Sequence, residues 1–312
     1  MAQGTEGADK GDARTSFYDD VLQSVRRTMV EDYGLRSITV RAVGSREARL
    51  SIPIVITGLD GEGGRRRYFG KIMGNSDLLS AHSMQMFKNL YLRMNGHEAL
   101  FGTSRTVEDM VRAQYESLLA IHRARIPTSR PYGYHWLDGV MWLLVLEHLD
   151  ARPISGVKEL DIRQVDTAFR HLRVMHRNRI YHGDIKPDNI MVDDRLYILD
   201  IGQYGEGVPA ARKRAYDLAS MACSFLGHHP AEDIVRVAGK HYNRRQLRAA
   251  ADYVELVQRR PDFDFSDGTR DRLVGLMRQP RAARSLRRRA RNADAKRPKR
   301  RRGRLRLRRA PK

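Results

Sequence analysis

Residues 182–202 read HGDIKPDNIMVDDRLYILDIG, and this run constrains the fold more than any other part of the chain. Two short apolar segments, 190–192 and 196–199, are separated by three polar residues, a pattern that predicts two strands joined by a tight turn. The outer ends of two antiparallel strands lie side by side. Asn189, just before the first strand, and Asp200, just after the second, are therefore predicted to meet at one edge of a hairpin.

Four polar side chains in this run have the chemistry needed for phosphoryl transfer from ATP. The reaction needs a carboxylate that orients the attacking hydroxyl, a cation on the migrating phosphoryl group, and hard oxygen ligands for a divalent metal. Asp184 can supply the first and Lys186 the second, while Asn189 and Asp200 can supply the third. We therefore predict that ATP and Mg²⁺, with Mn²⁺ as an alternative metal, are the cofactors. Asp184, Lys186 and Asn189 are the predicted catalytic residues, and Asn189 and Asp200 the predicted metal ligands.

The same run resembles the signature of a known superfamily. Residues 182–189 (HGDIKPDN) are similar to the catalytic loop H-R-D-x-K-x-x-N of the protein-kinase-like superfamily, and residues 200–202 (DIG) are similar to its D-F-G motif. The resemblance implies a bilobal α+β fold, in which a small lobe with an antiparallel sheet is followed by a helical large lobe.

An isolated lysine lies in a predicted strand upstream of this run. Lys71 has apolar neighbours over 68–73 and would be costly to bury without a charged partner. The resemblance implies that Lys71 holds the α- and β-phosphates of ATP and that an acidic residue of the next helix, predicted over 106–123, pairs with it. Glu116 is the preferred partner and Glu108 the alternative. A solvent-facing Lys71 without such a role is the alternative.

The end of a second predicted hairpin corresponds in order to the hinge between the two lobes. Strands over 132–137 and 140–147 flank an Asp-Gly dipeptide, which favours a two-residue turn. Glu147 and Leu149 lie at the end of this hairpin. The resemblance implies that backbone groups there contact the adenine ring.

The G-x-G-x-x-G loop that covers the phosphates in protein kinases is missing. Only one glycine lies between the first two predicted strands, 37–43 and 49–57. We expect Ser45 and neighbouring backbone N–H groups to contact the phosphates instead. Four glycines over 58–64 are an alternative phosphate loop, but they directly precede the Lys71 strand, which favours a hairpin loop.

Three further features are predicted from the pattern outside the motifs. A helix over 17–32 has apolar residues at every fourth position and should pack on the core. Residues 74–104 should form an inserted helix or helical pair over the small lobe, with a Met-rich face that fills the core. Pro53 restricts its strand to a sheet edge or a bulge, because proline cannot donate to the hydrogen-bond ladder.

The segment after Asp200 bears on the substrate. Asp217 resembles the aspartate of the superfamily's D-x-x-S helix, which braces the catalytic loop, but only 17 positions separate it from Asp200. No A-P-E motif is present, so the peptide-binding platform of ordinary protein kinases has little room. This short plan is similar to the RIO and lipopolysaccharide kinases and to small-molecule phosphotransferases, whereas Lys186 followed by proline favours a protein kinase. Residues 40–265 also resemble kinase-like domains attached to bacterial lysylphosphatidylglycerol-synthase-type membrane proteins.

Length and composition set the domain organisation. The 312 residues are enough for a two-lobed domain with extensions, predicted as a flexible leader over 1–14, a small lobe over 15–147 and a large lobe over 148–280. The single cysteine excludes a disulfide within the chain and favours a reducing, cytoplasmic compartment. No apolar run reaches the roughly 18 residues that span a bilayer, so no transmembrane segment is expected.

A basic tail carries most of the net charge. Residues 281–312 hold 17 Lys or Arg and one Asp, which accounts for +16 of the net charge of +21. The tail has no Phe, Tyr or Trp, so it lacks the stacking groups of a single-strand nucleic-acid binder. We expect a disordered segment that contacts nucleic acid, the ribosome or an anionic membrane through phosphate electrostatics. A solvated tail without a dedicated partner is the alternative.

The sequence therefore predicts an ATP-dependent phosphotransferase, with an atypical serine/threonine protein kinase as the first interpretation. One alternative is a kinase of a small molecule, a sugar or a lipid head group. Another is a non-catalytic nucleotide-binding module that regulates a partner. The acceptor is thus predicted as a protein or small-molecule hydroxyl.

Overall fold

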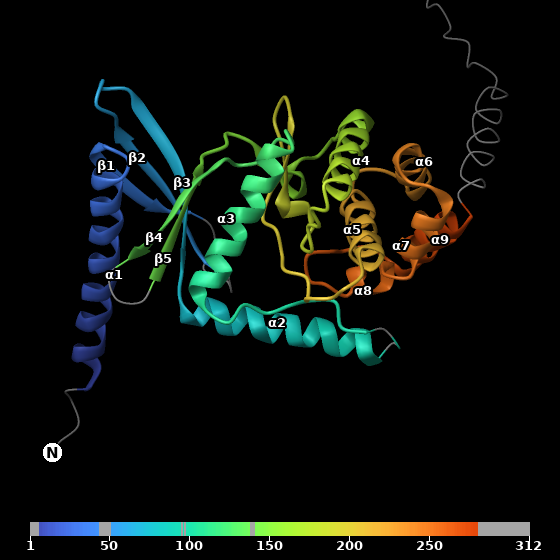
Figure 1. Ribbon diagram of the computed structural model, residues 1–312, viewed down its shortest axis with the longest axis horizontal. Helices are drawn as coiled ribbons and strands as arrows, with labels where there is room; N and C mark the ends of the chain where they lie inside the picture. Colours follow the sequence, from blue (N-terminus) through green and yellow to red (C-terminus); the bar gives the residue numbers. More distant parts are fainter. Residues whose placement is uncertain (1–5, 44–50, 95, 97, 138–140, 280–312) are drawn as a thin grey trace, which may run out of the picture.

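The computed structural model describes residues 6–43, 51–94, 96, 98–137 and 141–279. This part of the chain forms two lobes, a small lobe built on an antiparallel sheet and a large lobe built mainly of helices (Figure 1). The bilobal α+β fold predicted from the sequence is confirmed.

The sheet of the small lobe is covered by a helix on each face. Its strand order is β1-β2-β3-β5-β4, with all neighbours antiparallel. The strands are β1 (Arg36–Ala42), β2 (Ile52–Leu59), β3 (Arg65–Met73), β4 (Pro131–Leu137) and β5 (Met141–Glu147). Side chains alternate across a sheet, so Leu143 and Val145 of β5 pack toward helix α1 (Glu6–Glu31), whereas Leu144 and Leu146 pack toward α3 (Val107–Arg123). The apolar run of β5 reflects burial on both faces.

Helix α1 confirms the predicted core-facing stripe but is longer than predicted. Val21, Val25 and Met29 are buried against the sheet. The helix begins at Glu6, so most of the residues predicted as a flexible leader are helical. Extending an existing helix costs much less than starting one, and Ala, Glu, Lys and Arg are good helix formers, so the packed part propagates toward the N-terminus.

Helix α2 (Asn75–Met94) is the segment inserted between β3 and α3, and it runs along both lobes (Figure 1). Leu78 packs against the core of the small lobe, whereas Leu92 belongs to the core of the large lobe. The predicted helix over the small lobe is confirmed for the start of α2, and its continuation along the large lobe was not predicted. The predicted core-filling role of the methionines was wrong, because Met84, Met86 and Met94 are exposed. The helical period turns these positions away from the protein.

The large lobe holds one continuous apolar core. Its helices are α4 (Ile162–Arg177), α5 (Ala210–Ser224), α6 (Ala231–His241), α7 (Arg244–Ala251), α8 (Val254–Gln258) and α9 (Asp267–Arg278). A small sheet consists of β6 (Arg152–Pro153), β7 (Ile190–Val192) and β8 (Leu196–Ile198). The predicted hairpin is thus confirmed as β7 and β8. Cys223 is buried in α5, and burial raises the pKa of its thiol.

Two local predictions about β2 have different outcomes. The glycine-rich segment after β2 forms the β2–β3 hairpin loop, as predicted, and the Asp60 carboxylate accepts hydrogen bonds from two backbone N–H groups of that loop. The edge position predicted from Pro53 is wrong, because β2 lies between β1 and β3. Pro53 is tolerated because it lies beyond Ile54, the last β2 residue paired with β1. Within the described residues, no helix is both long and apolar enough to cross a membrane.

Candidate active site

The β7–β8 hairpin brings Asn189 and Asp200 to the catalytic loop, as the sequence predicts. Asn189 lies in the 3₁₀ turn η2 (Pro187–Asn189) just before β7, and its Nδ2 donates to the Asp184 carbonyl oxygen at 2.9 Å and to Asp184 Oδ2 at 3.3 Å. Asp200 follows β8 and has a positive φ of 57°, which is uncommon for a residue with a side chain. Strained backbone of this kind clusters at functional sites.

Asp217 of α5 holds the loop containing Asp184 through hydrogen bonds to the loop backbone. Its Oδ2 accepts from the His182 backbone N–H at 2.9 Å, and its Oδ1 accepts from that of Gly183 at 2.8 Å. His176 Nε2 and Tyr204 Oη complete the shell around the carboxylate, at 3.1 Å and 2.6 Å. Burial alone would raise the pKa of Asp217, but these hydrogen bonds and the nearby imidazoles lower it. Asp217 therefore braces the catalytic loop, as the D-x-x-S resemblance implies.

Lys71 of β3 pairs with Asp200, not with the predicted Glu116. Lys71 Nζ donates to Asp200 Oδ1, and the lysine side chain is largely buried. Burial would raise the pKa of Asp200, but Lys71 outweighs this effect and holds it below its usual range. Glu116 is exposed on α3 and makes no ion pair with Lys71. The alternative Glu108 also fails, since it pairs with Arg112. Sequence order indicated the helix correctly, but the direction of each side chain depends on helix rotation.

A buried arginine that sequence analysis missed contacts the catalytic loop. Arg260 follows α8, is only 5% exposed, and donates from Nη2 to Asp184 Oδ1 at 2.7 Å. Its Nη1 donates to the Ile185 carbonyl and to Tyr216 Oη, both at 3.2 Å. Burial opposes the charge of Arg260, but Tyr216 and the two neighbouring carboxylates raise its pKa. No local pattern marks this residue, because its contacts with Ile185 and Asp184 cross 75 and 76 positions of the sequence.

Asp262 links Arg260 to Lys186. The Lys186 Nζ donates to Asp262 Oδ1 at 3.0 Å, and Arg260 Nη2 donates to Asp262 Oδ2 at 3.0 Å. Burial would lower the pKa of Lys186, but Asp184 and Asp262 raise it, so the lysine remains charged. The cation that the sequence placed near the transferred phosphate is therefore part of an ion-pair network.

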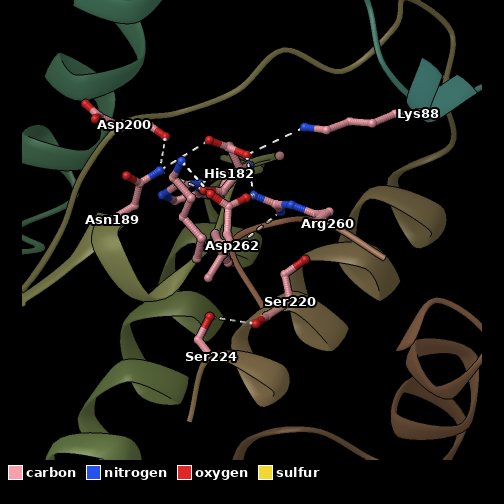
Figure 2. Close-up of polar contacts among 12 residues, drawn as sticks. Lys88, His182, Asn189, Asp200, Ser220, Ser224, Arg260 and Asp262 are labelled. Carbon is pink, nitrogen blue, oxygen red and sulfur yellow. Dashed lines mark hydrogen bonds and ion pairs between the residues drawn. The ribbon is translucent and has the colours of Figure 1, made fainter. Parts of the chain in front are cut away.

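A second residue outside the motif reaches the same point from α2. Lys88 is 15% exposed, and its Nζ lies 3.7 Å from Asp184 Oδ1. Figure 2 shows Lys88 pointing toward the cluster that contains His182, Arg260 and Asp262. The sequence located the inserted helix but not this side chain, because the contact joins residues 96 positions apart.

Of the predicted hinge residues, Glu147 ends β5 and Leu149 lies between β5 and β6. The Glu147 carbonyl accepts from Ser129 Oγ at 2.6 Å, and Glu147 also pairs in register with Tyr68 of β3. Leu149 follows the strand, and within the described part of the chain its backbone groups make no hydrogen bond. Free backbone groups at this position fit the predicted adenine contact. Ser45, the predicted phosphate contact, lies outside the described residues.

The donor set fits a magnesium ion bound together with nucleotide phosphates. The Asn189 amide nitrogen faces Asp184, so its oxygen is turned the other way, and the Asp200 carboxylate lies nearby (Figure 2). Magnesium is commonly held by one or two protein oxygens plus substrate phosphates, so two protein ligands suffice. Among the described residues, no group of three or more His, Cys, Asp or Glu is placed to hold a metal ion.

Comparison with known proteins gives weak but consistent sequence matches. The chain is 27% identical over 97 residues to the RIO-type serine/threonine-protein kinase Rio1 of Thermoplasma acidophilum, covering 30% of this chain and 50% of that protein. It is 25% identical over 129 residues to protein drl-1 of Caenorhabditis elegans, covering 39% of this chain and 20% of that protein. The chain thus spans half of the first relative and a fifth of the second. No protein-family model matches.

Two solved structures resemble the chain at low identity. One, described as a fructosamine-3-kinase from Haemophilus somnus 129PT, has a TM-score of 0.45 and 12% identity and covers 83% of this chain and 98% of that one. The PknI kinase domain of Mycobacterium tuberculosis has a TM-score of 0.40 and 14% identity, covering 78% and 95%. The sequence matches and the two-lobed fold together support assignment to the protein-kinase-like superfamily, of the atypical, RIO-like or a related type.

Proposed function

We propose that the protein is an ATP-dependent kinase that transfers the γ-phosphate of ATP to a hydroxyl group. The observation that carries this proposal is the convergence of Asp184, Asn189, Asp200 and Lys71 at one point between the lobes. These residues supply a hydroxyl-orienting carboxylate, hard oxygen donors and a phosphate-binding cation, which are the parts that phosphoryl transfer requires. The similarity to Rio1 supports the same class of reaction.

Each residue has a distinct role in this proposal. Asp184 orients the attacking hydroxyl and accepts its proton, and Lys186 neutralises charge on the transferred group. Asn189 and Asp200 hold the metal, whereas Lys71 binds the α- and β-phosphates. Bound magnesium would supply further neutralisation of the phosphates. Lys71 already lies beside Asp200, so the phosphate-binding cation and the metal ligand are positioned together.

A serine or threonine hydroxyl of a protein is our first candidate for the acceptor. The name of the Rio1 relative and the presence of Lys186 in the catalytic loop support it. A small molecule, sugar or lipid head group is the second candidate. It is favoured by the short stretch between Asp200 and the start of α5 at Ala210, which leaves little room for a peptide platform.

Two substitutions test the proposal, because Asp184 and Asp200 have different roles. Asp184→Asn should abolish phosphate transfer and leave Mg·ATP binding within about threefold, because this residue acts on the acceptor. Asp200→Ala should also weaken binding, and should do so only in the presence of Mg²⁺. Isothermal titration with ATP, with and without Mg²⁺, and transfer of label from γ-labelled ATP are the measurements. Unchanged turnover in both variants would rule out the kinase function.

A further inference from the structure

The inserted helix α2 carries a lysine to Asp184. Its Lys88 lies 3.7 Å from Asp184 Oδ1 and 5.1 Å above the centre of the Phe101 ring. No hydrogen bond shorter than 3.5 Å connects Lys88 Nζ to another described residue. An ammonium group has three donors. Lys88 is therefore a mostly buried cation with unused donors beside the residue proposed to orient the acceptor.

Lys88 belongs to a cluster of charged side chains. Burial lowers its pKa, and the side chains that act on it are the carboxylates Asp184 and Asp262 and the cations Arg260 and Lys186. A largely buried ammonium group whose nearest carboxylate oxygen lies 3.7 Å away is costly unless an anion compensates it.

Lys88 is held in place by the structure around α2. The neighbouring Asn89 side chain accepts from the backbone N–H groups of Leu100 and Phe101 and donates to the Phe101 carbonyl, at 2.9 to 3.0 Å. Phe101 in turn forms a β-bridge with Tyr204 and stacks on its ring. These contacts fix α2 to the segment that follows Asp200. Lys88 is thus part of a built site and is not a loose surface lysine.

We propose that the acceptor alcohol carries a carboxylate or phosphate close to its reacting hydroxyl, and that Lys88 binds this anionic group. The inference rests on the kinase function proposed above and specifies its substrate class. With the hydroxyl hydrogen-bonded to Asp184 and the anion hydrogen-bonded to Lys88, the 3.7 Å between the two side chains limits the two acceptor groups to a separation of a few bonds. Lys88 is thereby a specificity-determining residue.

The proposed transfer balances without a further reactant. The acceptor oxygen forms a bond to the γ-phosphorus as the bond from phosphorus to the β–γ bridging oxygen breaks. ADP leaves with that electron pair, and the hydroxyl proton passes to Asp184. Lys88 takes no part in bond making, so its effect falls on which acceptor is chosen.

The test compares acceptors with and without an anionic group near the hydroxyl. Glycerol 3-phosphate and glycerate are compared with glycerol, and serine peptides with Glu, Gln or Lys beside the serine are compared with one another. The quantity measured is the ratio of kcat/KM for the anionic and the neutral acceptor in the full chain. We expect a ratio on the order of 10- to 100-fold in favour of the anionic acceptor, as for one hydrogen bond to a charged group.

Three variants of α2 assign that ratio to Lys88. Lys88→Met keeps the apolar stem and helix propensity and should bring the ratio close to one, whereas Lys88→Arg should retain the preference. Arg93→Met removes a cation from the exposed last turn of the same helix and should leave the ratio unchanged. A second readout is the weakening of glycerol 3-phosphate binding, measured by ligand NMR without ATP, in Lys88→Met only.

The outcomes separate this inference from the proposed function. Preference confined to the small molecules, or confined to the Glu peptide, supports the inference and identifies the source of the anion. Transfer by the unmodified chain with no preference for anionic acceptors, or with the same preference in Lys88→Met, overturns the inference alone. Failure to bind Mg·ATP and to transfer phosphate to any acceptor or to water overturns both.

Discussion

At the scale of single residues, Arg260 makes the contacts with the catalytic loop that the sequence did not predict. It is buried, and its guanidinium joins Asp184, Asp262, Tyr216 and the Ile185 carbonyl. An arginine presents several donors in a fixed planar arrangement, which a lysine cannot reproduce. Arg260 therefore positions Asp184 as well as compensating its charge.

Replacing Arg260 by lysine should separate geometry from charge. Arg260→Lys keeps the cation but loses most of the four contacts, so kcat should fall roughly 10- to 100-fold and stability should fall by about 1–3 kcal/mol. Steady-state kinetics and urea unfolding measure the two effects. Arg278→Lys, which alters an exposed pair with Asp252, is the control and should change stability by less than about 0.5 kcal/mol. Full activity in Arg260→Lys would contradict the positioning role.

At the scale of elements, one carboxylate joins α4, α5 and the catalytic loop. Asp217 is fully buried and accepts four hydrogen bonds, two of them from backbone N–H groups of the loop. Its folded pKa lies below its usual value of 3.8. The unfolded chain therefore binds more protons than the folded chain at low pH, and stability rises with pH in that range.

The contribution of Asp217 should be present at neutral pH and lost on acidification. It is complete above pH about 4 and disappears as the pH falls through the lower folded pKa. Asp217→Asn should cost about 3–5 kcal/mol at pH 7, and the loss should shrink below pH 4. Urea unfolding over a pH series measures this, with Asp252→Asn on the surface as control. A cost that does not change with pH would show that the carboxylate charge is unimportant.

Helix α2 offers a second test, because its opposite faces have different surroundings. Leu92 is 1% exposed and packs in the large-lobe core, whereas Leu90 is 52% exposed. Leu92→Ala should destabilise the protein by about 2–5 kcal/mol, and Leu90→Ala by less than about 0.5 kcal/mol. Thermal unfolding of both variants is the measurement. Equal effects would contradict the rotation of α2 described here.

How much of the fold and of the candidate site could be predicted from the sequence depends on how many positions separate the residues in contact. The β7–β8 hairpin and the helices α3 and α4 were predicted because alternation, periodicity and turn residues act over a few positions. The positions of Lys88 and Arg260 beside Asp184 were not, since these contacts cross 96 and 76 positions and depend on how whole elements pack. The predicted pairing of Glu116 with Lys71 was wrong for the same reason. Its helix α3 was predicted correctly, but the direction of the Glu116 side chain was not.

At the scale of the whole molecule, the charge is divided unevenly. Residues 281–312 carry +16 of the net +21, which leaves +5 for the other 280 residues. We expect attraction of the tail to polyanions to come from its cations alone, with each contributing on the order of 1 kcal/mol near an anionic surface. Such attraction weakens as salt is added.

Removal of residues 281–312 should separate this attraction from catalysis. The shortened chain should bind Mg·ATP and transfer phosphate nearly as well as the full chain, and should lose salt-sensitive binding to RNA and to anionic vesicles. Salt titrations of both chains against each polyanion measure the difference. Identical binding curves would refute a tether, and loss of catalysis would show that the tail supports the fold.

The attachment of α2 at both ends has a mechanical consequence. Leu78 near its start is packed into one lobe and Leu92 near its end into the other, so the helix acts as a rod fixed at two points. A helix is stiff along its axis, so α2 sets the separation of these two packing points. Because Lys88 lies between them, the same helix sets the distance between Lys88 and Asp184.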